Sequence, residues 1–75
     1  MSKLRKISGT RAIRTFEKLG FILVRQRGSH VVMRKYRPGG DIGCVIPLHR
    51  ELKIGTLKGI LRQAKISEEE FINSL

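Results

Sequence analysis

The tripeptide Gly28-Ser29-His30 stands between two apolar runs and places an imidazole where it could do acid–base chemistry. Its sequence predicts a hairpin turn that brings His30 to the first position of a strand. Arginines lie on both sides, at Arg25, Arg27 and Arg34. An imidazole is the side chain best suited to accept and donate protons at physiological pH. The pattern indicates a general base beside groups that attract an anion.

The charge of the whole chain indicates what that anion is. Its 75 residues carry 16 Lys plus Arg against 6 Asp plus Glu, a formal net charge of +10. This predicts attraction to nucleic acid, to an anionic membrane or to an acidic protein. RNA cleavage needs a base at the 2′-OH and cations at the phosphate, which favours RNA and makes His30 the candidate catalytic residue. The candidate RNA-binding residues are Arg25, Arg27, Ser29, Arg34, Lys53 and Lys58.

Other chemistry is less well supported by the residues. His49 is either a second acid–base group or, the favoured interpretation, a loop residue with a structural role. The histidines and the single cysteine show no ligand spacing, so we expect no metal site. Cys44 is expected to be a core residue. Because it can form no intrachain disulfide, it indicates a reducing compartment such as the cytoplasm. No apolar stretch is long enough to predict a signal peptide or a membrane span.

Hydrophobic periodicity and turn residues predict how these groups are positioned. The expected elements are a helix over 9–19 capped by Ser8, strands over 21–26, 30–36 and 42–46, a helix capped by Thr56 that runs through Ala64, and a short last helix opened by a Ser67–Glu70 capping box. Short connections favour an antiparallel meander, and the helices must cover one of its faces. The prediction is an α+β fold, with residues 1–75 as a single domain.

The turn also predicts a register. If Arg27-Gly28 is a two-residue loop, Arg25 lies opposite His30, and Val24 lies opposite Val31. The two faces of the hairpin are then Phe21, Leu23, Arg25, His30, Val32, Arg34, Tyr36 and Ile22, Val24, Gln26, Ser29, Val31, Met33, Lys35. Both faces carry apolar residues, but helices cover only one. The uncovered face is therefore expected to contact a partner.

Several short motifs follow one another along the chain. They are Ser8-Gly9, Leu19-Gly20-Phe21, Gly28-Ser29-His30, Ile46-Pro47-Leu48-His49, Lys53 with Gly55-Thr56-Leu57, and Ile60-Leu61-Arg62-Gln63-Ala64. In this spacing the chain resembles the HicA toxin family of bacterial toxin–antitoxin systems over nearly its whole length. The resemblance implies a double-stranded-RNA-binding-like fold and a metal-independent ribonuclease that cleaves mRNA. It also implies inhibition by a HicB-type antitoxin in a hetero-oligomer, with the family's catalytic histidine at His30.

Two alternatives stay open. One is a non-catalytic RNA-binding module, since duplex RNA is bound by basic groups on a first helix, a hairpin and the start of a following helix. Residues of that kind are Arg14, Lys18, Arg27, Lys53 and Lys58. The other is a protein with no RNA preference that binds an acidic partner. Substitution of His30 by Ala distinguishes the enzyme from the binding module. An enzyme should lose turnover and keep its RNA affinity, whereas a binding module has no turnover to lose and should lose little affinity.

Overall fold

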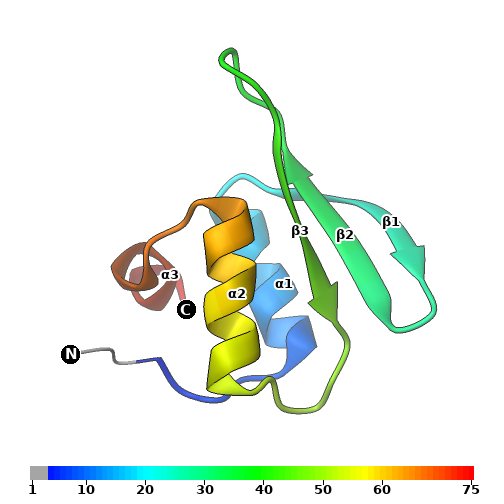
Figure 1. Cartoon of the computed structure of the whole chain (residues 1–75), viewed down its shortest axis with the longest axis vertical. Coiled ribbons are helices and arrows are strands. Elements are labelled where there is room, and N and C mark those ends of the chain that lie inside the picture. Colours follow the sequence, from blue (N-terminus) through cyan, green and yellow to red (C-terminus); the bar gives the residue numbers. More distant parts are fainter. Residues whose placement is uncertain (1–3) are drawn as a thin grey trace.

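The computed structural model describes residues 4–75, which form three helices and three strands (Figure 1). In chain order they are α1 Gly9–Lys18, β1 Ile22–Arg27, β2 His30–Lys35, β3 Ile42–Pro47, α2 Ile54–Ala64 and α3 Glu68–Ser74. The strands form one antiparallel sheet in the order β1-β2-β3. The predicted α+β order is confirmed.

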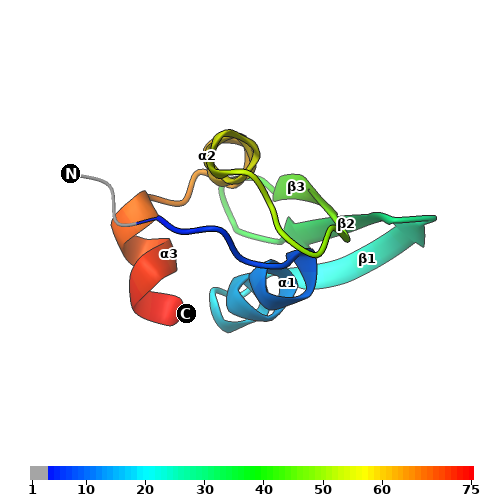
Figure 2. The same cartoon turned by 90° about the horizontal axis from the view of Figure 1, so that it is seen from below.

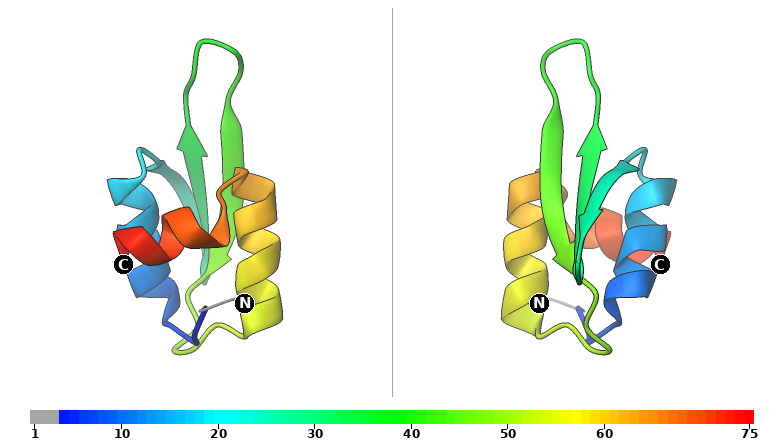
Figure 3. Two further views of the ribbon diagram at one scale, coloured as in Figure 1. Left: turned by 90° about the vertical axis from the view of Figure 1, so that its left-hand side faces the viewer. Right: turned by 90° about the vertical axis from the view of Figure 1, so that its right-hand side faces the viewer.

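The helices lie on one side of the sheet, and the strands extend away from them (Figure 2). The strands stand in front of α3 in the right-hand view of Figure 3. Phe16 of α1 lies in the core, its ring centroid 5.2 Å from that of Phe21 and 5.5 Å from that of Phe71. β2 and β3 bury one set of alternate side chains against the helices, namely Val31, Met33, Ile42, Cys44 and Ile46. Within residues 4–75, no helix covers the other face of the sheet (Figure 3).

The ends of α1 and α3 follow from local chemistry. The Ser8 hydroxyl accepts a hydrogen bond from the Arg11 backbone N–H, as predicted, and α1 ends one residue earlier than expected. At the C-terminal end of α1, Lys35 Nζ donates a hydrogen bond to the carbonyl of the C-cap residue Leu19 at 3.0 Å. The predicted capping box of α3 is confirmed: Ser67 Oγ accepts from the Glu70 N–H, and Glu70 Oε1 accepts from the Ser67 N–H. These bonds satisfy backbone groups that a helix end leaves unpaired.

The predicted start of α2 is wrong. The helix begins at Ile54, with Lys53 as its N-cap and no side-chain cap, so Thr56 lies within the first turn. The reason is a contact from outside the helix. Leu52 is fully buried, and its N–H donates to the Ile7 carbonyl at 2.7 Å, which fixes the chain just before the helix. Burial of Leu52 therefore sets the start of α2.

The predicted hairpin register is also wrong. The two-residue turn is Gly28-Ser29, so Arg27, not Arg25, pairs with His30. Gly28 has a φ of 57°, and a glycine with positive φ at the first central position is typical of a type II′ turn. A register shift between Leu23 and Arg25 then leaves Val24 as a bulge.

The bulge changes which residues of β1 share a face. Directly opposed residues of an antiparallel pair lie on the same face. Arg25 and Arg27 oppose Val32 and His30, while Ile22 opposes Arg34. All three β1 residues therefore lie on the face of His30, although Ile22 was assigned to the other. Leu23 was assigned to the face of His30, but it opposes the buried Met33 and so lies on the other face. The assignment was correct for β2, where the buried Val31 and Met33 alternate with His30, Val32 and Arg34.

Candidate active site

His30 occupies an exposed position on the central strand, at the end where the hairpin turns. Its pairing partners are Arg27 on β1 and Pro47 on β3. Opposed residues have Cβ atoms about 4.5–5.5 Å apart, so the Arg27 guanidinium can reach an anion bound at the imidazole. The structure therefore gives His30 a different cationic neighbour from the one that the sequence predicted.

Backbone contacts fix the segment after β3 beside the hairpin turn that precedes His30. The Leu48 N–H donates to the Ser29 carbonyl at 2.6 Å, and the Gly9 N–H donates to the His49 carbonyl at 2.9 Å. Gly9 packs so closely here that an added Cβ would collide with the Pro47 carbonyl oxygen. These contacts join the hairpin turn, the segment 47–49 and the start of α1, and so hold the surroundings of His30.

Sequence reasoning missed this role of Gly9. The only signal was a glycine in the first turn of a helix, where no turn conformation requires one. The backbone carbonyl of His49 accepts the hydrogen bond from Gly9, and His49 is exposed. Because this contact uses only the backbone, both interpretations of the His49 side chain stay open.

The open face of the sheet concentrates positive charge. Arg25, Arg27 and Arg34 lie on the face of His30, and β1, β2 and β3 contain no Asp or Glu. The ion pair found within residues 4–75 joins Lys6 Nζ and Glu51 Oε1 at 3.8 Å, and uses none of these arginines. A phosphate that binds here meets cations without competing carboxylates on the strands.

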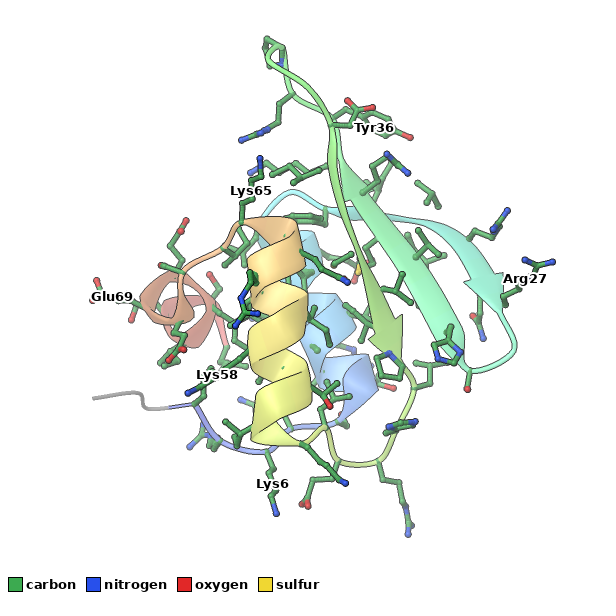
Figure 4. All side chains as sticks on the ribbon, in the orientation of Figure 1. Lys6, Arg27, Tyr36, Lys58, Lys65 and Glu69 are labelled. Carbon is green, nitrogen blue, oxygen red and sulfur yellow. The ribbon has the colours of Figure 1, made fainter. Side chains whose placement is uncertain are left out.

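The remaining predicted site residues lie elsewhere. Ser29 is in the turn itself, and Lys53 is the N-cap of α2. Lys58 projects from α2 on the side opposite to Arg27 (Figure 4). The structure thus groups three arginines with His30 but does not bring Lys58 to them.

A comparison with known families matches this framework. A family model described as HicA toxin of bacterial toxin-antitoxin matches residues 9–66, from the start of α1 to just beyond α2. The chain belongs to the HicA toxin family. A search of curated proteins returned no match. The match includes the whole sheet with His30, whereas α3 of this HicA chain lies beyond the matched residues and still buries Phe71 in the core.

The structure offers this HicA chain few other reactive groups. Cys44 is buried, and burial raises the pKa of its thiol to about 12, so the reactive thiolate is suppressed. Over residues 4–75, His, Cys, Asp and Glu form no group of three or more that could hold a metal ion. In the same part of the chain, no helix has the length and hydropathy needed to cross a bilayer.

Proposed function

We propose that this HicA-family protein is a toxin that cleaves mRNA without a metal ion, with His30 as general base or acid. The observation that carries the proposal is the placement of His30. It is exposed on the central strand, it is paired with Arg27, and it shares a carboxylate-free sheet surface with Arg25 and Arg34. Imidazole supplies proton transfer, and guanidinium groups stabilise a phosphate whose negative charge increases in the transition state.

The proposed reaction uses a nucleophile within the RNA. The 2′-oxygen attacks the adjacent phosphorus while His30 removes its proton. The bond from phosphorus to the 5′-oxygen then breaks, and that oxygen receives a proton. The products are a 2′,3′-cyclic phosphate and a 5′-hydroxyl. His49, Ser29 and water are the candidate sources of the second proton. Tyr36 follows the far end of β2, about 20 Å along the strand from His30, and is too distant for this role.

The test of catalysis compares the wild type with His30→Ala on end-labelled single-stranded RNA in excess EDTA. We expect both proteins to bind the RNA and the variant to cleave it about 10²–10⁴-fold more slowly than the wild type. Equal cleavage by both would remove His30 from the mechanism. Binding by both without cleavage by either would favour the RNA-binding module. That alternative is supported by Lys58, which projects from α2 on the side away from Arg27 (Figure 4), and by Lys53 at the N-cap of the same helix.

The proposed partner is a HicB-type antitoxin that covers the open face. This face carries exposed apolar side chains, Ile22 and Val45 among them, beside the arginines. An acidic partner with apolar residues would complement it. We expect the complex to be inactive on RNA and to unfold at a higher temperature than the toxin alone, because binding to the native state stabilises it. Cleavage at the free-toxin rate by the complex would contradict this proposal.

A further inference from the structure

One row of side chains on β2 extends from His30 beyond the end of the strand. Burial of Val31 and Met33 fixes the alternation, so His30, Val32 and Arg34 point to the open face. The next outward position is Tyr36, directly after β2, and it is 60% exposed. Figure 4 shows Tyr36 and Arg27 both projecting away from α2. At about 3.3 Å per residue, the row from His30 to Tyr36 is about 20 Å long.

The two ends of this row differ in charge. Arg27 lies beside His30, and Arg25 lies opposite Val32, so guanidinium groups flank the first half. The second half has Arg34, the phenol ring of Tyr36 and the carboxylate of the exposed Asp41, which precedes β3. A phosphate is therefore favoured near His30, whereas at the other end the Arg34 and Asp41 charges oppose each other and the exposed ring of Tyr36 offers an aromatic surface.

We propose that a single-stranded segment of the RNA lies along β2, with one base stacked on Tyr36 a few nucleotides from the bond that is cleaved beside His30. This inference rests on the proposed ribonuclease function and names how its substrate is held. Aromatic side chains next to basic groups bind single strands in this way, because every base has a face that can stack. Bases within a duplex are already stacked on one another, so the same surface selects single-stranded over duplex RNA.

An RNA segment fits this row better than a protein segment. The apolar pair formed by half-buried Val32 and exposed Val45 would by itself suit either ligand. Three arginines on strands without a carboxylate favour a ligand that carries a negative charge at every repeat, which a nucleic acid backbone supplies.

Tyr36 itself provides the signal for the test. It is the only tyrosine, and the chain has no tryptophan, so the intrinsic fluorescence of the protein reports on this residue. The experiment titrates full-length His30→Ala in EDTA with an unstructured single-stranded RNA of about 12 nucleotides, within the usual site sizes for such binding. We expect quenching of the Tyr36 fluorescence by the single strand and much less by a duplex of the same sequence.

Affinity measurements on the same background complete the test. Replacement of Tyr36 by Ala should weaken single-strand binding by about 5- to 100-fold, and Tyr36→Phe should stay within about twofold because it keeps the ring. Lys65→Gln is the charge control, since Lys65 projects from the end of α2 and not from the open face (Figure 4). Circular dichroism verifies that each variant is folded.

The outcomes separate this inference from the function on which it rests. RNA binding without quenching, or equal affinity of Tyr36→Ala and its parent, overturns the stacking proposal even if the wild type cleaves RNA. Equal quenching by the duplex overturns the selection for single strands. If the wild type neither binds nor cleaves RNA, the ribonuclease proposal fails and the inference fails with it.

Discussion

The substitution Gly9→Ala tests how the surroundings of His30 are held together. Gly9 lies at the start of α1, against the Pro47–Leu48 backbone, and its N–H donates to the His49 carbonyl at 2.9 Å. An added Cβ would collide with the Pro47 carbonyl oxygen and would lie 3.0 Å from Leu48 Cα. Both obstacles are backbone atoms, so the helix and the segment 47–49 must move apart.

The expected loss of stability follows from two terms. Overpacking at a close contact costs about 1–3 kcal/mol. Weakening of the Gly9 hydrogen bond adds about 0.5–1.5 kcal/mol. A net loss of about 2–3 kcal/mol lowers the melting temperature of a domain of this size by about 10–20 °C. Urea and thermal unfolding, followed by circular dichroism, measure both quantities.

Gly59→Ala is the matched control. Gly59 lies inside α2, and an added Cβ there would meet nothing within 4 Å. Alanine is a better helix former than glycine by about 0.5–1 kcal/mol, so this variant should be more stable than the wild type. The same chemical change thus has opposite signs at the two positions. A Gly9→Ala protein as stable as the wild type would refute the account of this corner.

Three further predictions concern the core, α3 and the RNA. Cys44 should resist thiol reagents at pH 8 until the protein unfolds, because burial raises the pKa of its thiol from 9.0 to about 12. For the same reason the unfolded chain loses this proton at a lower pH than the folded protein does, so the free energy of unfolding should fall as the pH rises above about 9. Fast labelling of the native protein would contradict this. Ser67→Ala should lose about 1 kcal/mol in urea unfolding, because it removes the cap of α3; no change would mean that the cap does not contribute. RNA affinity should fall with salt, with a slope of about −0.7 in log K against log salt for each phosphate contact. Arg25→Ala should make that slope shallower by one such contact, whereas a flat salt response would refute electrostatic binding.

The sequence predicted helix ends that are fixed by residues close together in the chain. The Ser8 cap and the Ser67–Glu70 capping box each lie within a few residues of sequence, and both are confirmed. On β2, the two-residue period correctly grouped Val31 with Met33 and His30 with Val32 and Arg34, because successive strand residues point to opposite faces. It did not predict which group the helices cover, since both groups contain apolar residues.

What the sequence did not predict depends on contacts between distant segments. Every residue of β1 is exposed, so its pattern carried no signal of the bulge at Val24. The position of the turn at Gly28-Ser29, which pairs Arg27 with His30, was not predicted either. The start of α2 depends on burial of Leu52, and the direction of Lys58 depends on how that helix lies on the sheet. Sequence thus predicted His30 as a candidate but not which cation lies beside it.

The chemistry of the RNA ends tests the central claim most directly. After digestion of a labelled RNA by the wild type in excess EDTA, the fragments are analysed for their terminal groups. The account predicts 2′,3′-cyclic phosphate and 5′-hydroxyl ends, and no cleavage where the nucleotide 5′ to the scissile bond carries a 2′-deoxyribose. Fragments with 5′-phosphate and 3′-hydroxyl ends would contradict it, because they require attack by water rather than by the 2′-oxygen from which His30 removes a proton.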